Sequence, residues 1–538
     1  MDIAALDELF QPFASGDAPG MVVGIAQHGK TLYRRGFGLA SVELGVANAP
    51  WTRMRIGSTS KQFTCLAVLL LSEEGRIDPD ASIRDYMPEL PELNGEPSLR
   101  QLMWHTGGYR CALDLSFIAD GLAMQPEGGA LTNQLRQTAA NFAPGESSVY
   151  CNSGYHLLSH VIARVSGMPL AQFLHDRIFS PLGMLNSALV PSDLEIHRGM
   201  ATLYLPQSCG GWTRGIFPSE EVLGEGGIVS TVDDMLRWLA HLRQPAIVGS
   251  GATWAQMTTL SHLNNGTINP YALGLMRHDY RGVEVIHHAG GVIGGASQML
   301  TVPTHALDVI IMTNGAVANP VDLANQVVDT VLGDALGPRA QKAEAELFRP
   351  LLGTRYHSQS TGHVVGFEDV GGKLSLSFLN SAAIPLTDSG DALRVGFEEV
   401  AVGPLTLPIA QLAELREAPI WLEFSDAGHN SVLERLPVEP PSMASVATEL
   451  AGAYYAADLG AAAELRRDGD ALSLHIHGPR GGAVMTIKAI GADVLAMKSP
   501  IAALSLSGIV NVKRQAGRVT GFTLDTLRTR HLQFVRED

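Results

Sequence analysis

Residues 57–75, Gly-Ser-Thr-Ser-Lys-Gln-Phe-Thr-Cys-Leu-Ala-Val-Leu-Leu-Leu-Ser-Glu-Glu-Gly, are the stretch that best indicates the fold. Apolar residues recur at helical spacing after Lys61, and Gly75 is a typical helix end, so the stretch predicts a helix. Ser58 and Lys61 are three residues apart at its start. Side chains at this spacing share one helix face. We therefore expect the Lys61 amine to reach the Ser58 hydroxyl.

This Ser–Lys pair is suited to nucleophilic catalysis. A serine hydroxyl needs a neighbouring base, and a lysine serves as that base when burial lowers its pKa. The helix N-terminus adds positive potential that stabilises an oxyanion. An isolated S-x-x-K is nevertheless expected about once by chance in a chain of this length, and Ser58 could simply cap the helix. The pair therefore needs support from other motifs.

Two further motifs follow along the chain. In Tyr150-Cys151-Asn152 the phenol could shuttle a proton and the Asn152 amide could hold a substrate carbonyl. His288-Ala289-Gly290-Gly291 ends a strand pattern, where small residues let a substrate backbone lie close and the Gly291 amide could join that of Ser58 as an oxyanion donor. Each has an ordinary alternative: a tyrosine packed in the core, an asparagine helix cap, or a partly buried strand histidine.

The chain around these motifs reads as α/β. Residues 20–27 and 31–38 predict a β-hairpin, and Ser230-Thr231 followed by two aspartates predicts a helix start. Later segments predict three strands and a closing helix, at 283–287, 296–302, 307–313 and about 320–336. Strands at both ends with helices between them indicate one mixed sheet flanked by helices.

The chain changes character after about residue 337, where short alternating runs and turn residues indicate antiparallel β structure. Leu352-Gly353-x-x-Tyr356 is echoed by Ala451-Gly452-x-x-Tyr455, and Leu374-Ser375-Leu376 by Leu472-Ser473-Leu474, at an offset of about 98–99 residues. Two echoes in register indicate a duplicated β domain, with small barrels as the expected form. We predict domains at residues 1–336, 337–440 and 441–538.

The three motifs in this order resemble the signature of the serine β-lactamase and penicillin-binding superfamily over about residues 15–335. Residues 102–108, Leu-Met-Trp-His-Thr-Gly-Gly, are similar to the L-x-x-H-T-[SG]-G segment of that superfamily. A closer resemblance, carried by residues 58–65, 150–152 and 451–455, is to the D-aminopeptidase family, in which two related eight-stranded β-barrels follow the catalytic domain. The fold implied is multidomain, an α/β (α+β) serine β-lactamase-like catalytic domain followed by two small antiparallel β-barrels.

The resemblance implies a cytoplasmic bacterial serine hydrolase that releases N-terminal D-amino acids from peptides, amides or esters through an acyl-enzyme. It implies that Ser58 is the nucleophile and that Lys61 accepts and donates its proton. Tyr150 and His288 would complete the hydrogen-bonded site. Substrate binding is expected at Asn152, Gly290 and Gly291.

In that family a loop of the third domain enters the catalytic cleft. Its counterpart here, residues 477–483, holds no acid to pair with a substrate amine, and Arg480 carries the opposite charge. We expect Arg480 and Gly481 to face the substrate.

Two alternative functions stay open. The same site could serve an esterase, a DD-carboxypeptidase or a weak β-lactamase, although His288 in place of a lysine attracts a substrate carboxylate less strongly. A catalytically silent penicillin-binding-like interaction module is the other alternative, and the presence of both Lys61 and Tyr150 disfavours it.

Composition excludes several other classes. The formal net charge of −16 disfavours nucleic acid and anionic membranes as partners, and the longest aliphatic run, residues 66–71, is too short to cross a bilayer. An N-terminus without a basic start and apolar run predicts a cytoplasmic protein. Small peptides, amides or esters are the expected partners, with a homodimer possible.

No metal or other cofactor is expected. The four cysteines have no CxxC spacing. His156 and His160 are four residues apart and could face a metal, but no third ligand is apparent in the sequence, so helix packing is the better interpretation.

Overall fold

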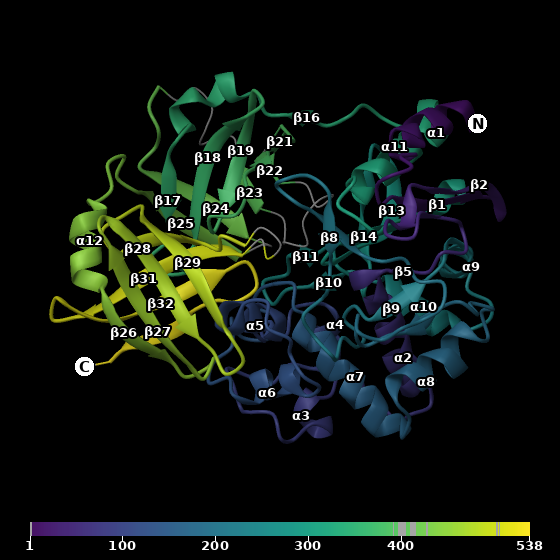
Figure 1. Cartoon of the computed structure of the whole chain (residues 1–538), viewed down its shortest axis with the longest axis horizontal. Helices are drawn as coiled ribbons and strands as arrows, with labels where there is room; N and C mark the ends of the chain where they lie inside the picture. The colour runs from purple at the N-terminus through teal and green to yellow at the C-terminus, as the bar shows by residue number, and fades with distance from the viewer. Residues whose placement is uncertain are drawn as a thin grey trace.

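The computed structural model describes residues 3–390, 392–395, 405–408, 416–426, 429–501, 504 and 506–537. Three regions follow one another along the chain: a mixed helix-and-strand region drawn purple to teal, a green β region and a yellow β-barrel (Figure 1). The multidomain architecture expected from the sequence is confirmed.

A six-stranded sheet forms the centre of the first region, in the order β12–β13–β14–β15–β1–β2. Its strands are β1 (Met21–Gln27), β2 (Lys30–Phe37), β12 (Met276–Tyr280), β13 (Val283–Val292), β14 (Gly295–Val302) and β15 (Leu307–Thr313). The predicted β1–β2 hairpin is confirmed. The predicted mixed sheet is wrong, because every pairing is antiparallel. Strands β12 to β15 follow one another through short turns, and parallel neighbours would need long crossovers.

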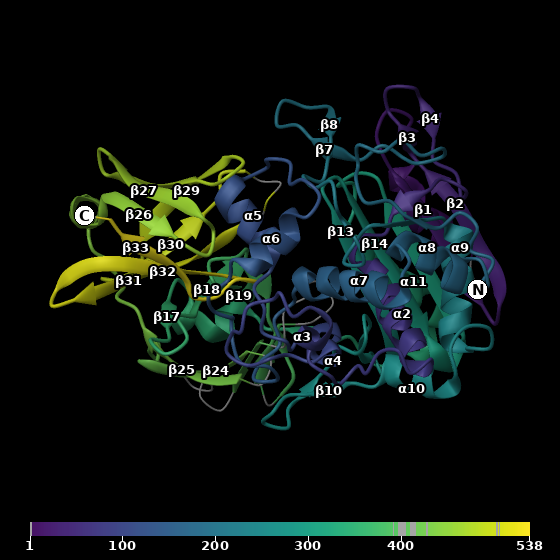
Figure 2. The same ribbon diagram turned by 90° about the horizontal axis from the view of Figure 1, so that it is seen from below.

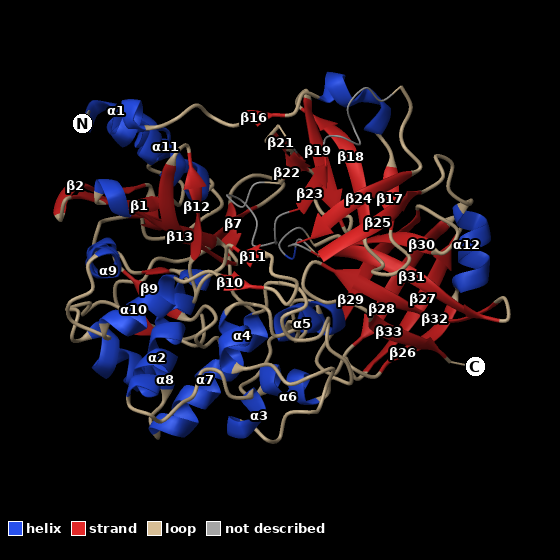
Figure 3. Cartoon of the chain, turned by 180° about the vertical axis from the view of Figure 1, so that it is seen from behind, coloured by secondary structure: helices blue, strands red, loops and turns tan. Residues whose placement is uncertain are grey.

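Helices cover both faces of this sheet (Figure 3). On one face Val23 and Ile311 pack with helix α1 (Ile3–Phe10) and helix α11 (Pro320–Leu332). On the other, Val22 and Ile310 pack with helices α2 (Lys61–Glu73) and α9 (Val232–Arg243). Neighbouring residues of β1 thus serve opposite cores, as the two-residue period of a strand requires.

Several helices of this region begin at a residue whose side chain caps the first turn. The predicted start at Thr231 is confirmed, since its hydroxyl accepts a hydrogen bond from the Asp234 amide. The remaining helices of this region are α3 (Ile83–Tyr86), α4 (Leu99–Met103), α5 (Ala112–Asp120), α6 (Gly129–Leu135), α7 (Asn152–Ser166), α8 (Leu170–Leu174) and α10 (Gly251–Thr258). In the described part of the chain no single helix has the length and apolarity to cross a membrane; residues 152–166 and 170–179 meet that test only as a pair bent by 79°.

The second region is a ten-stranded sheet, in the order β16–β21–β22–β23–β24–β25–β17–β18–β19–β20. Its strands are β16 (Gln341–Lys342), β17 (Arg355–His357), β18 (Val364–Val370), β19 (Lys373–Phe378), β20 (Ile384–Pro385), β21 (Thr387–Asp388), β22 (Ala392–Arg394), β23 (Leu405–Pro408), β24 (Trp421–Asp426) and β25 (His429–Arg435). We expected a barrel here. As described, the strands form a half-barrel whose edge strands β16 and β20 are two residues long, too short for a closing ladder.

The third region is the predicted closed barrel, formed by β26 to β33 in sequential order. Its strands are β26 (Gly452–Ala456), β27 (Ala461–Asp468), β28 (Ala471–His477), β29 (Gly482–Ala489), β30 (Val494–Lys498), β31 (Ser507–Gln515), β32 (Arg518–Thr526) and β33 (Leu532–Arg536). Helix α12 (Met443–Leu450) packs against the barrel through Val446, Ala447 and Leu450. The prediction of antiparallel β structure after about residue 337 is therefore wrong at α12, which is a helix.

The two β regions repeat the same strand meander. The Leu-Ser-Leu echo falls on β19 and β28, the third strand of each meander. The tyrosine echo needs correction, because Tyr356 is fully buried whereas Tyr455 is 43% exposed. Tyr454 is the buried counterpart, since alternation along β26 turns it into the barrel core.

The barrel docks on the first region through α5, whose Leu115, Ile118 and Ala119 join the apolar core of the barrel. Figure 2 shows this helix lying against the barrel. Beside it, the Arg110 guanidinium forms a buried ion pair with Asp458, and Arg110 also donates to the Arg530 carbonyl at 3.0 Å. The barrel is therefore held to the first region by a shared core and a buried charge pair.

Candidate active site

Ser58 lies in a 3₁₀ turn, Gly57–Ser60, directly before α2. The turn reaches β13 closely because Gly57 has a φ of +52°, and a Cβ there would lie 2.7 Å from the Gly291 amide nitrogen. Only glycine combines this backbone conformation with this approach. The turn that carries Ser58 and the strand that carries Gly291, the two predicted oxyanion donors, are therefore in direct contact.

Lys61 is completely buried beneath Ser58. Its Nζ lies 3.0 Å from Ser58 Oγ, 2.8 Å from Asn152 Oδ1 and 2.7 Å from the Glu225 carbonyl oxygen. The contact expected from the S-x-x-K spacing is thus present. A neutral amine has two N–H groups and one lone pair. Because the Asn152 and Glu225 oxygens can only accept, they take both hydrogens, and the lone pair is left for the Ser58 hydroxyl.

Burial lowers the pKa of Lys61 to about 7. The nearby Glu225 opposes this shift, and the Arg528 guanidinium adds to it. At neutral pH a large share of Lys61 is therefore uncharged, which is the state that can take the serine proton.

Tyr150 lies above Lys61, with its ring centroid 4.7 Å from Nζ. Its hydroxyl is buried and has no hydrogen-bond partner among the described residues. Burial raises the pKa of Tyr150, and the neighbouring Ser58 hydroxyl opposes the shift without reaching hydrogen-bond geometry. Tyr150 therefore stays protonated, and its hydroxyl is free to donate a proton during a reaction. The alternative of a satisfied core hydroxyl does not fit.

His288 lies on β13, with its ring centroid 6.2 Å from that of Tyr150. Its Nδ1–H donates to the Ala289 carbonyl at 2.6 Å, and its Nε2 accepts from the Tyr271 hydroxyl at 2.8 Å, a tautomer assigned from these partners. Burial lowers the pKa of His288 to about 3, so the ring is neutral. These contacts make His288 a candidate positioning residue that acts through Tyr271.

Asn152 and Gly290 contribute to the site in different ways. Asn152 is the first residue of α7 rather than its cap, and its side chain holds Lys61. A Cβ on Gly290 would lie 1.9 Å from the Ile56 carbonyl oxygen, so this glycine lets β13 pack against the chain just before Ser58. Gly290 thus shapes the site from behind.

A cavity of about 640 Å³ opens above these groups. Ser58, Asn152 and Gly291 line it from the first region, and Leu504 and Arg528 line it from the barrel. The Arg528 guanidinium carbon lies 5.6 Å from the Tyr150 ring centroid. The barrel therefore reaches the mouth of the site through residues that the sequence analysis did not select.

The loop at residues 477–483 lies elsewhere. The amides of Arg480 and Gly481 donate to Asp120 Oδ1 at 3.0 and 3.2 Å, and the Arg480 guanidinium donates to Gln125 Oε1 at 3.0 Å. Neither Arg480 nor Gly481 is among the residues that line the cavity, although Gln125 is. The loop supports the cavity wall from outside, so the expectation that Arg480 and Gly481 face the substrate does not match this geometry.

The predicted site residues on the first region all lie within a segment with known relatives. The beta-lactamase family matches residues 6–333. The chain belongs to the beta-lactamase family. With the Ser58–Lys61 pair in place, the protein is a serine hydrolase.

Curated relatives in this family are similar over much of the chain. A D-aminopeptidase of Brucella anthropi is 28% identical over 391 residues, covering 70% of this chain and 71% of that protein. A D-aminopeptidase of Brucella canis is 27% identical over 365 residues, 66% of each chain.

Solved structures show the same fold. The octameric penicillin-binding protein homologue of Pyrococcus abyssi has a TM-score of 0.57 at 22% identity and covers 81% of this chain and 100% of its own. The D-amino acid amidase of Ochrobactrum anthropi SV3 complexed with L-phenylalanine amide has a TM-score of 0.52 at 21% identity, covering 62% and 99%.

Sequence reasoning missed three features of this beta-lactamase-family site: Tyr271, Arg528 and the segment that contains Glu221 and Glu225. Both glutamates line the cavity with Ser58. The only local signal is the glycine-rich run at 224–227, where a Cβ on Gly227 would lie 2.1 Å from the Val222 carbonyl oxygen. Such a run indicates tight backbone packing but does not say which helix it packs against.

Proposed function

We propose that the protein releases N-terminal D-amino acids from small peptides, amides or esters through an acyl-enzyme on Ser58. The observation that carries the proposal is the Lys61 amine, buried and directed at Ser58 Oγ from 3.0 Å. The preference for D-residues rests on the D-aminopeptidase relatives at 27–28% identity.

The chemistry follows from these contacts. Ser58 Oγ attacks the substrate carbonyl while Lys61 Nζ takes its proton, and backbone amides of Ser58 and Gly291 stabilise the oxyanion. The bond to the leaving amine or alcohol then breaks as that group receives a proton from Lys61, with the Tyr150 hydroxyl as the relay. Water attacks the ester on Ser58 by the same steps in reverse, releasing the amino acid and restoring the Ser58 hydroxyl.

A free substrate amine needs an acid, and the cavity supplies one. Glu221 lines the cavity together with Ser58. Glu221 could therefore supply, from the first region, the carboxylate that residues 477–483 lack. We infer that Glu221 pairs with the substrate ammonium group, which favours an aminopeptidase over an enzyme for blocked substrates.

Arg528 favours a second candidate, the hydrolysis of esters or peptides that carry a free carboxylate. Its guanidinium lines the cavity, and no hydrogen bond or ion pair of that group is found within the described residues. A guanidinium in this position suits a carboxylate ligand. This reading corresponds to the esterase or DD-carboxypeptidase alternative.

A panel of D- and L-aminoacyl p-nitroanilides, with the amine free or acetylated, tests these candidates. We expect hydrolysis of free-amine D substrates, with a mass increase on Ser58 during turnover. Ser58→Ala should reduce the rate to background, whereas Ser180→Ala, an exposed serine, should not change it. Full activity of Ser58→Ala would exclude the mechanism, and a preference for acetylated substrates with a free carboxylate would favour the second candidate.

Glu221→Gln sharpens the assignment. We expect KM to rise for free-amine substrates and to change little for acetylated ones. An equal rise in KM for both substrate classes would exclude pairing of Glu221 with the amine.

Self-association as a homodimer or larger assembly stays a prediction that light scattering can test. A cytoplasmic location stays a prediction that cell fractionation can test.

A further inference from the structure

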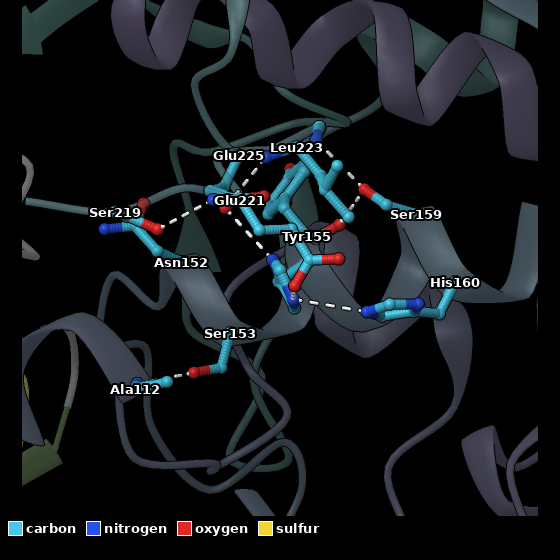
Figure 4. Close-up of polar contacts among 12 residues, drawn as sticks. Ala112, Asn152, Ser153, Tyr155, Ser159, His160, Ser219, Glu221, Leu223 and Glu225 are labelled. Carbon is cyan, nitrogen blue, oxygen red and sulfur yellow. Dashed lines mark hydrogen bonds and ion pairs between the residues drawn. The ribbon is translucent and has the colours of Figure 1, made fainter. Parts of the chain in front are cut away.

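A cluster of metal-ligating side chains lies on the cavity wall between α7 and residues 219–226. One ring nitrogen each of His156 and His160 and one carboxylate oxygen of Glu221 all lie within 4.8 Å of one another. Figure 4 shows the His160 ring directed toward the group of side chains that includes Glu221 and Glu225. The third ligand that the sequence did not reveal therefore comes from a loop 61 residues after His160.

The distances fit one small cation. The two Nε2 atoms are 3.2 Å apart, and Glu221 Oε2 is 3.7 Å from His156 Nε2. Two ligands at about 2.0–2.1 Å from a tetrahedral zinc ion are about 3.3 Å apart. Small side-chain rotations therefore bring all three atoms to bonding distance of a shared centre.

The hydrogen bonds around the cluster also fit a metal site. Glu225 Oε1 lies 3.1 Å from His156 Nδ1, so that ring donates its proton there and presents the Nε2 lone pair to Glu221 and His160. This carboxylate–histidine arrangement is the usual outer support of a metal-bound imidazole. The amide of Gly128 holds Glu221 Oε2 at 2.8 Å. The Nε2 atom of His156 thus lies between His160 Nε2 and Glu221 Oε2, at 3.2 and 3.7 Å.

We propose that His156, His160 and Glu221 bind a divalent transition-metal ion of the zinc type, with Glu225 orienting His156. Two imidazoles and one carboxylate are typical of zinc sites that keep a position open. His156 and Glu221 line the same cavity as Ser58, whereas His160 does not. The open position therefore faces the cavity, where water or a polar substrate group completes the coordination.

Glu221 enters both this proposal and the proposed amine recognition. The two roles exclude each other: with an ion bound, Glu221 is a metal ligand, and its pairing with a substrate ammonium group applies to the metal-free protein. The metal proposal stands on its own geometry, however, and its test does not depend on hydrolysis.

The test uses the full-length protein after treatment with a chelator. Titration with Co²⁺ should produce a visible absorption band that saturates at one Co²⁺ per protein molecule. Added Zn²⁺ should displace the Co²⁺ and remove the band. His160→Gln should abolish this binding at the same concentrations, while His262→Gln, an exposed histidine outside the cluster, should leave it intact. Circular dichroism checks that both variants fold.

Two further variants guard against ambiguous results. Glu225→Gln should weaken Co²⁺ binding about 10–100-fold, since it removes the outer support. Ser58→Ala should bind Co²⁺ as the unmodified protein does, so a failed hydrolase assignment would not affect the outcome. Absence of saturable binding, or equal binding by the unmodified protein and His160→Gln, would overturn the metal site.

Discussion

The half-barrel and the closed barrel echo each other in sequence and share a strand meander, yet they relate to the active site differently. The closed barrel shares an apolar core with α5 and places Arg528 in the cavity. The half-barrel packs onto the closed barrel instead, in a core that includes Ile490, Val494 and Ile509. A few docking residues, rather than the β fold itself, decide which copy contributes to the site.

The largest effect should come from breaking the docking of the closed barrel. Asp458→Asn removes the charge that compensates Arg110, whose side chain is only 1% exposed. Loss of one partner of a buried pair costs about 3–5 kcal/mol. Urea denaturation followed by circular dichroism should show a lower midpoint. The double variant Arg110→Met, Asp458→Leu should recover only part of this loss, because the Thr138 amide and hydroxyl also lose Asp458 Oδ1 as their acceptor. A double variant as unstable as Asp458→Asn would mean that the unpaired charge is not the main cause of the loss.

A smaller effect should follow from removing the charged side chain that the barrel places in the cavity. Arg528→Gln should lower kcat/KM for substrates with a free carboxylate by about 10- to 100-fold, because one charge-assisted hydrogen bond is lost. Neutral substrates should be affected less. Arg466→Gln, at an exposed ion pair on the same barrel, is the control. Equal losses for both substrate classes would remove Arg528 from carboxylate recognition.

The pH dependence of kcat/KM offers a finer measurement of how the charge of Arg528 acts on Lys61. Because Lys61 must be uncharged to act as a base and its pKa is about 7, kcat/KM should rise with pH through that value. The positive charge of Arg528 lowers the pKa of Lys61. Arg528→Gln should therefore raise that pKa and shift the acidic limb to higher pH by a fraction of a unit. A shift to lower pH would contradict the assignment of Lys61 as the base.

The smallest effect should come from the half-barrel. Lys373 pairs with Glu344 at its surface, with side chains 38% and 55% exposed. Exposed pairs contribute about 0–1 kcal/mol. Lys373→Ala should therefore hardly change the urea midpoint or the hydrolysis rate. A loss comparable to that of Asp458→Asn would show that the half-barrel also supports the active site.

The sequence predicts best what is local. The Ser58–Lys61 contact follows from a spacing of three residues, and the helix start at Thr231 follows from capping chemistry. Contacts between distant segments are not encoded in any short pattern. Lys61 meets the Glu225 carbonyl across 164 residues, and Arg528 reaches Tyr150 from another domain. His160 illustrates the same limit, because its spacing from His156 is visible but Glu221 is found only by folding the chain.

The partners of Arg110 are synthesised long after Arg110 itself. Asp458 is made 348 residues after Arg110, and Arg530 is made 420 residues after it. Until those residues leave the ribosome, the newly made first region exposes an uncompensated arginine beside the apolar face of α5. Transiently exposed apolar surface of this kind makes a folding chain prone to aggregation. A chain without the folded barrel therefore leaves the apolar face of α5 uncovered and lacks the part of the cavity wall that Arg528 forms.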